Sequence, residues 1–121
     1  IINSHPAILP KYKGRDCVGW SILNNDKVGA TVHLIDLGID TGPILFRESI
    51  DFSDCKSLIE TRIKVMKKCA DLILKAVLSF VFNTSKLIEQ SSDNAITFPE
   101  MSNEEVKQVE KIIMANYKSN I

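Results

Sequence analysis

The sequence predicts an α/β domain, because short apolar runs typical of strands alternate with stretches of helical periodicity. Residues 28–35 and 43–50 form two strand-like runs separated by a loop that contains glycines. A long segment that follows, ending at about Phe82, repeats apolar residues at steps of three and four, as an amphipathic helix does. Together these patterns favour a sheet covered by helices.

The N-terminal elements are short. Residues 1–2 have the composition of the end of a buried strand, and prolines at positions 6 and 10 exclude regular strand pairing and predict an extended loop. Asp16 is a suitable N-cap for a short helix over residues 17–23. The motif residues near the start of the chain are therefore expected in loops next to strands.

The central strands are predicted to be neighbours. Residues 28–35 carry apolar side chains at successive positions, as a strand covered on both faces requires. The loop over residues 36–42 has two glycines and no helical periodicity, and residues 43–50 return as a strand. So short a connection favours antiparallel pairing of the two strands.

The long helix is expected to start at caps offered by residues 51–54. Its core face is predicted to hold Leu58, Ile59, Ile63, Met66, Cys69, Ala70, Ile73, Leu74, Val77 and Leu78, opposite a charged face of Glu60, Lys64, Lys67, Lys68 and Asp71. Residues 87–88 and 96–98 are expected to be short strands. Ser102 and Glu105 have capping-box spacing and open a final amphipathic helix.

Composition excludes several classes of protein. The chain has 121 residues, 45% hydrophobic and 25% charged, which predicts one globular domain. Its formal net charge is zero, so charge gives no reason to expect binding to nucleic acid or to an anionic membrane, and no apolar run has the length of a membrane span. Cys17, Cys55 and Cys69 lack disulfide or metal-ligand spacing, which favours reduced thiols in a cytoplasmic protein.

Two motifs carry the candidate chemistry. The first, residues 3–14, reads NSHPAILPKYKG, and the second, residues 36–45, reads DLGIDTGPIL. They supply an amide, an imidazole and a carboxylate next to strand-like runs. A histidine with a carboxylate partner can move a proton, and an amide can bind a developing oxyanion.

These motifs resemble those of the folate-dependent formyltransferase family, which carries N-x-H-P-x-x-L-P-x-Y-x-G followed by D-x-G-x-D-T-G-P-I-L. The resemblance extends from Ile1 to about Phe46 and is diffuse beyond it. It implies an open, mostly parallel, Rossmann-like sheet with an antiparallel strand pair and flanking helices. Residues 1–121 are then expected to be the C-terminal portion of such a domain, a single partial domain that lacks the N-terminal half.

The resemblance also implies an activity, the transfer of a formyl group from N10-formyltetrahydrofolate to a primary amine of a small molecule, without a metal. Asn3 is the implied donor to the oxyanion, and His5 the proton shuttle, charged and oriented by Asp40. Loss of one oxyanion donor typically costs about 2.7–4 kcal/mol of barrier. The folate is expected to contact Ile35, Asp36, Leu37, Gly38 and Ile39.

The sequence departs from the family pattern at several positions, some of which bear on the identity of the acceptor amine. Ser4 stands where an apolar residue is usual, and Lys67 and Lys68 follow Arg62 where glycinamide-ribonucleotide formyltransferases have a Glu-His pair. The chain also has no room for the extra C-terminal domain of methionyl-tRNA formyltransferases. The lysines argue mildly against glycinamide ribonucleotide and the missing domain argues against methionyl-tRNA, while a nucleotide-linked amino sugar is the third candidate acceptor.

Two other readings of the sequence stay open at this point. The chain is a non-catalytic or partner-dependent fragment, completed by its N-terminal half or by homo-oligomerisation, or it hydrolyses formyltetrahydrofolate with water in place of the amine. His33 is expected to be a packed sheet histidine, and Asp36 to be a turn residue.

Overall fold

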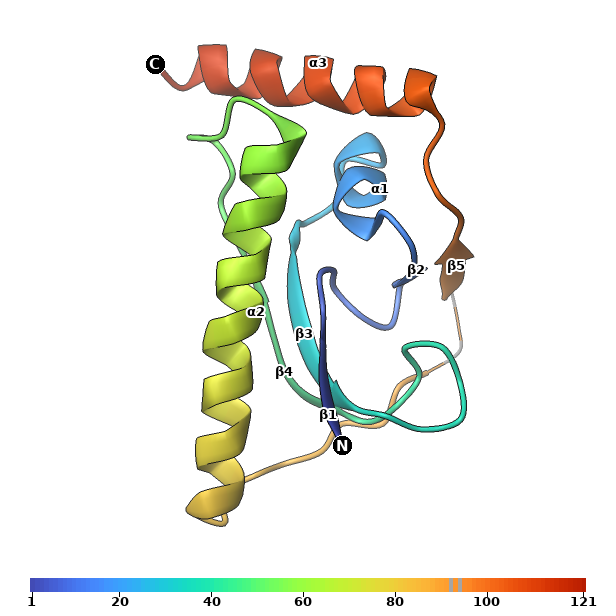
Figure 1. Ribbon diagram of the computed structural model, residues 1–121, viewed down its shortest axis with the longest axis vertical. Helices are drawn as coiled ribbons and strands as arrows, with labels where there is room; N and C mark the ends of the chain where they lie inside the picture. Colours follow the sequence, from blue (N-terminus) through green and yellow to red (C-terminus); the bar gives the residue numbers. More distant parts are fainter. Residues whose placement is uncertain (92, 94) are drawn as a thin grey trace.

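The computed structural model describes residues 1–91, 93 and 95–121 (Figure 1). Its elements in chain order are β1 (Ile2–His5), β2 (Tyr12–Gly14), α1 (Cys17–Leu23), β3 (Gly29–Leu34), β4 (Ile44–Ser49), α2 (Leu58–Val81), β5 (Ile96–Phe98) and α3 (Asn103–Ser119). Helices and strands alternate along the chain, which confirms the predicted α/β class.

A three-stranded sheet in the order β1-β3-β4 forms the centre of the fold. β3 pairs antiparallel with β4, as predicted, and also antiparallel with β1, where Asn3 lies opposite His33 and His5 opposite Thr31. The expectation that Asn3 and His5 lie in a loop is wrong, because β1 continues through His5. Pairing stops at Pro6, the first residue that lacks a backbone N–H.

The strand β5 brings a segment near the C-terminus next to a strand near the N-terminus. It pairs parallel with β2, which places Phe98 beside Gly14 (Figure 1). The predicted strand over residues 96–98 is therefore confirmed, whereas residues 87–88 contribute a single bridge from Ile88 to Ile44. Among the described strands, only β2 and β5 are parallel, so the mostly parallel sheet of the family is not formed by these residues.

The helix α2 runs along the sheet, and α3 crosses one end of the molecule above α1 (Figure 1). The main core lies between these layers. It is formed by Val18, Ile22, Val28, Ala30, Val32, Leu45, Leu58, Val65, Leu72, Ala76, Val109 and Ile113. No helix of the described residues is long and apolar enough to cross a membrane.

The face of α2 that packs on the sheet differs from the predicted one. Its buried residues are Leu58, Thr61, Val65, Cys69, Leu72, Ala76 and Ser79. A second apolar stripe, called here the outer stripe, is exposed and consists of Ile59, Ile63, Met66, Ile73, Leu74, Val77 and Val81. The buried face includes the small residues Thr61, Ala76 and Ser79, so ranking the two stripes by hydrophobicity favours the outer one.

The helix caps explain where the helices start. Ser57, rather than residues 51–54, caps α2 by accepting a hydrogen bond from the backbone N–H of Glu60. The predicted capping box of Ser102 and Glu105 opens α3 and is confirmed. Asp16 holds the N-cap position of α1, but its side chain makes no cap hydrogen bond.

Candidate functional site

The first motif and strand β3 place four polar side chains close together. Side chains alternate between the two faces of a strand, so Asn3 and His5 project from the same face of β1. Their cross-strand partners on β3, His33 and Thr31, lie on that face as well. Asp40, from the loop between β3 and β4, completes the group.

His5 is buried, and both of its ring nitrogens have partners. Nε2 lies 2.7 Å from the backbone carbonyl oxygen of Tyr12. A carbonyl oxygen can only accept, so Nε2 carries the proton of the neutral ring. Nδ1 then has a free lone pair, and it lies 3.6 Å from Oδ2 of Asp40. This nitrogen can take up a second proton next to a carboxylate.

Burial lowers the pKa of His5 below its ordinary value of 6.5. The Asp40 carboxylate and the hydrogen bond to Tyr12 raise this pKa, but they do not offset the loss of solvation. Asp40 thus favours the charged imidazole, as expected, but desolvation outweighs this effect in the folded site. The lowered pKa favours the neutral ring, which can accept a proton at Nδ1.

Asp40 is held by backbone groups from two other segments. Its residue adopts a left-handed conformation with φ of 55°. Its Oδ2 accepts a hydrogen bond of 3.1 Å from the N–H of Gly14, and its backbone carbonyl accepts one of 2.9 Å from Nε2 of Gln90. The side chain is 15% exposed, so the carboxylate lies at the boundary between the interior and solvent.

His33 connects Asn3 with Asp40. Its Nδ1 donates to the carbonyl of Leu34 at 2.9 Å, which leaves Nε2 as an acceptor. Nδ2 of Asn3 lies 3.3 Å from that Nε2 and donates to it, and Oδ1 of Asp40 lies 3.8 Å away. The prediction of a packed sheet histidine is confirmed, since His33 is 2% exposed, but its contacts also orient the amide of Asn3.

The expected folate-contacting residues form the exposed part of the loop between β3 and β4. Ile35, Leu37 and Ile39 are exposed. The side chain of Asp36 accepts hydrogen bonds from the Thr41 hydroxyl and from the N–H of Gly38, which holds its pKa below the ordinary value. Asp36 is thus the turn residue that the sequence predicts.

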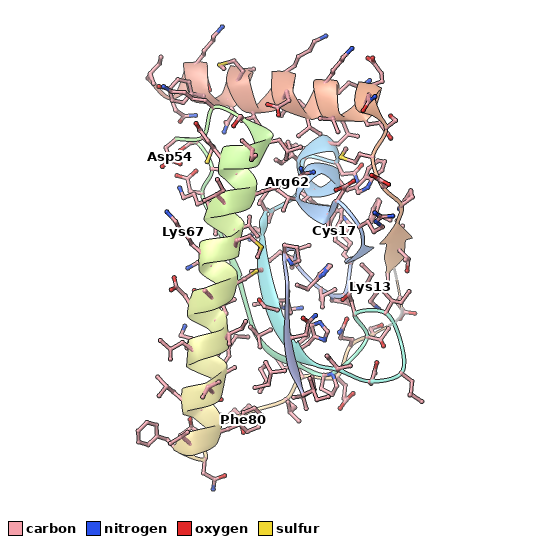
Figure 2. The ribbon with its side chains drawn as sticks, viewed as in Figure 1. Lys13, Cys17, Asp54, Arg62, Lys67 and Phe80 are labelled. Carbon is pink, nitrogen blue, oxygen red and sulfur yellow. The ribbon has the colours of Figure 1, made fainter. Side chains whose placement is uncertain are left out.

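A pocket of about 230 Å³ adjoins this group. Pro6, the neighbour of His5, and Gly14, the donor to Asp40, belong to its wall, which is completed by Asp16, Cys17, Val18, Arg62 and Met66. Figure 2 shows Arg62 on the side of α2 that faces α1, where its guanidinium lies 3.2 Å from the Asp16 carboxylate. The pocket therefore has largely apolar walls and one ion pair, between Arg62 and Asp16.

Cys17, Lys67 and Lys68 supply no reactive group to the pocket. Burial raises the pKa of the Cys17 thiol to about 12, so this cysteine stays protonated and is a poor nucleophile. Lys67 is exposed on the side of α2 that faces away from α1 (Figure 2), and Nζ of Lys68 lies 3.7 Å from the Glu48 carboxylate. Neither lysine lines the pocket. Among the described residues, no three His, Cys, Asp or Glu side chains are grouped as a metal site.

The arrangement suits proton transfer beside an oxyanion. Asn3, His5 and Asp40 were predicted from the motifs, and the fold brings them together around His33. The contribution of Gly14 and Gln90 was missed, because a backbone N–H and a residue from a distant segment leave no pattern in the sequence. The alternation of Thr31, His33 and Ile35 along one strand was the available signal for His33.

Comparison with known proteins agrees with this geometry. Residues 1–79 match the protein family described as formyl transferase. The methionyl-tRNA formyltransferase of Clostridium perfringens is 26% identical over 121 residues, which are 99% of this chain and 39% of that protein. The chain therefore spans about two fifths of the length of this relative.

Two solved structures with a similar fold are formyltransferases. The formyltransferase PseJ of Anoxybacillus kamchatkensis matches with a TM-score of 0.77 and 24% identity, over 95% of this chain and 65% of PseJ. The N-formyltransferase of Helicobacter canadensis, in complex with folinic acid and dTDP-3-aminofucose, matches with a TM-score of 0.70 and 25% identity, over 97% of this chain and 46% of that protein. The family match covers more than half of the chain, and the chain belongs to the formyl transferase family.

Proposed function

We propose that this chain carries the acid–base site of an enzyme that transfers a formyl group from N10-formyltetrahydrofolate to a primary amine. The observation that carries the proposal is the position of the free Nδ1 of His5, 3.6 Å from the Asp40 carboxylate. The amide of Asn3 projects from the same face of β1. Family membership supports the same reaction class.

His5 acts first as a base. The attacking amine must lose a proton as it adds to the formyl carbon, and neutral His5 accepts that proton at Nδ1, directly or through one water. The resulting imidazolium is stabilised by Asp40 on one side and by the Tyr12 carbonyl at Nε2 on the other. His5 then returns the proton to the leaving nitrogen, so no net proton is lost.

Asn3 stabilises the negative charge on the formyl oxygen. One N–H of its amide is directed to His33, which fixes the plane of the group and leaves the second N–H for the oxyanion. Such a preorganised donor costs little reorganisation during the reaction. His33 is a positioning residue in this mechanism.

The loop between β3 and β4 is suited to hold the formyl donor. Ile35, Leu37 and Ile39 offer exposed apolar side chains to a flat ring system. The Asp36 hydrogen bonds to Gly38 and Thr41 keep the backbone of the loop in one shape. The donor supplies an activated formyl group, and similarity to a protein solved with folinic acid supports a folate in this role.

The proposed acceptor is a nucleotide-linked amino sugar. The Helicobacter canadensis protein was solved with dTDP-3-aminofucose, and this similarity supports a nucleotide-linked amino sugar as the acceptor. The zero net charge of the chain offers little attraction to a tRNA. Methionyl-tRNA, the substrate class of the matched sequence relative, is an outcome that the assay below distinguishes.

The site is proposed to need a further part of a formyltransferase domain. β1 is an edge strand of the described sheet, and the alternation of antiparallel pairing directs the backbone groups of Ile2 and Ser4 to its outer edge. The outer stripe of α2 is exposed as well. An open edge and an apolar helix face suit another strand and its covering element, and a second copy of the chain is the alternative occupant.

The compartment is proposed to be the cytoplasm. Cys17, Cys55 and Cys69 are buried and free. Unpaired thiols fit a reducing environment.

The experiment is complementation. This chain is fused to the part of the Helicobacter canadensis protein that it does not match, and the fusion is assayed with N10-formyltetrahydrofolate and a panel of amines. The panel contains a dTDP-amino sugar, glycinamide ribonucleotide and methionyl-tRNA, and a reaction without any acceptor amine is run beside them. Formylation of the amino sugar supports the proposal, and its loss in the His5→Asn fusion assigns the activity to this chain.

A fusion that folds and binds the folate but formylates none of these amines would contradict the proposed reaction. Formylation of methionyl-tRNA in preference to the sugar would replace the proposed acceptor. Release of formate without any acceptor would identify a hydrolase.

A further inference from the structure

The segment that leads from α2 to β5 contacts the loop that carries Asp40. Ile88 in this segment pairs with Ile44 through two backbone hydrogen bonds of 2.8 Å. This bridge fixes the segment next to the start of β4, directly after the loop. Gln90, two positions further on, lies outside the residues that match the family.

Gln90 makes two hydrogen bonds to the loop backbone. Its Nε2 donates to the carbonyl of Asp40 at 2.9 Å and to that of Gly42 at 2.6 Å. Oε1 is buried and has no hydrogen-bond partner among the described residues. Rotating the amide by half a turn would place Oε1 against two carbonyl oxygens, so the two bonds fix its orientation.

Asp40 and Gly42 both have narrow limits on their backbone conformation or surroundings. Asp40 has a φ of 55°, a conformation that is costly for a residue with a side chain. Gly42 lies so close to the Leu34 carbonyl that a Cβ atom would clash with it at 1.6 Å. Gln90 ties together the two carbonyls on either side of Thr41, and thereby fixes the direction in which the Asp40 carboxylate leaves the backbone.

We propose that Gln90 is a positioning residue that holds the Asp40 carboxylate against His5 and against the N–H of Gly14. The catalytic consequence rests on the proposed function, whereas the geometric one does not. Without Gln90 the loop relaxes, the carboxylate withdraws, and the Gly14 amide loses its acceptor. The catalytic effect then follows through Asp40 alone.

The test compares Gln90→Met, which keeps the length of the side chain but removes the donors, with Glu89→Gln, a change at the exposed neighbouring residue. In the 121-residue chain, we expect the Gly14 amide to exchange with solvent at least about fivefold faster in Gln90→Met, the range for a lost hydrogen bond. The Asp26 amide, which donates to Ser21, is the internal control and is expected to be unchanged.

In the complemented enzyme, Gln90→Met is expected to lower kcat, and to add little to the loss caused by Asp40→Asn. Independent, multiplicative losses in the double variant would overturn the proposal, and so would an unchanged Gly14 amide in Gln90→Met. Gln90→Glu, equal in shape but unable to donate at neutral pH, repeats both measurements if the Met variant fails to fold. If formyl transfer is absent altogether, the proposed function fails, and the Gly14 amide still decides this inference.

Discussion

Oδ2 of Asp40 lies 3.6 Å from Nδ1 of His5, and the same oxygen accepts a hydrogen bond from the backbone N–H of Gly14. The carboxylate therefore faces a basic nitrogen without being neutralised by a permanent cation. Its position depends on three segments: the end of β2, the loop after β3, and the segment that contains Gln90. Changes at Asp40 are therefore expected to affect catalysis more than the packing of the fold.

We expect Asp40→Asn to reduce the turnover of the complemented enzyme by at least about a hundredfold, on the scale of general acid–base catalysis. The asparagine can still accept from Gly14, so the fold should be retained, but it cannot stabilise a charged His5. Turnover and circular dichroism are the measurements. Glu89→Gln, the same change of carboxylate to amide at an exposed residue, is the matched control, and a similar loss in that variant would show that the effect is not specific to Asp40.

The pKa of His5 is expected to lie below 6.5, because burial disfavours its charged form. In Asp40→Asn it should fall further, since the carboxylate that favours the charged ring is gone. Titration of the His5 ring by NMR measures both values, and His33→Gln assigns the signal because the chain has two histidines. A pKa that rises on loss of Asp40 would show that the two groups are not coupled as the distance suggests.

Stability should decrease in mild acid because of His5. The folded state binds the proton less readily than the unfolded state, so this contribution is complete above pH 6.5 and is lost as the pH falls from there to the lower pKa of the folded state. Urea unfolding between pH 7.5 and 5 measures it. His5→Gln should show a flatter dependence, and an equally steep one would assign the acid sensitivity to other groups.

The isolated 121-residue chain is expected to self-associate and to have little or no formyltransferase activity. The outer stripe of α2 and the open edge of β1 leave apolar surface and backbone groups without partners among the described residues. Positioning the two substrates can supply roughly 7–11 kcal/mol of rate enhancement, and a partial pocket does not provide it.

Sedimentation velocity tests the same surface with Leu74→Lys, in the outer stripe, against Lys67→Glu on the charged side of α2. The leucine variant should shift the chain toward monomer, and the lysine variant should not. A wild-type chain that is monomeric and turns over any amine of the panel at a normal enzymatic rate would refute this expectation.

Element positions followed from the sequence where a local rule decided them. The capping box of Ser102 and Glu105, the helix over residues 17–23 and the antiparallel strands around residues 36–42 each depend on neighbours in the chain. Asn3, His5 and Asp40 were found through motifs in which the chemistry needs those residue types. These features depend on residues that are close together in the chain, so the sequence alone was sufficient to predict them.

The face of α2 could not be predicted in the same way. Two apolar stripes lie on this helix, and periodicity identifies both without saying which one meets the sheet. The stripe with small residues, including Thr61, Ala76 and Ser79, packs inward, because the approach of helix and sheet is limited by the side chains between them. The more hydrophobic outer stripe is left exposed.

By itself, the sequence determined the α/β class, the candidate reactive side chains and the family to which the chain belongs. Only the tertiary structure decided that His33 accepts from Asn3, that Gln90 donates to the Asp40 loop and that His5 is buried. These three facts depend on contacts between residues far apart in the chain and on the loss of solvent around a ring. These contacts and this loss of solvent do not exist until the strands pair and the helices cover them.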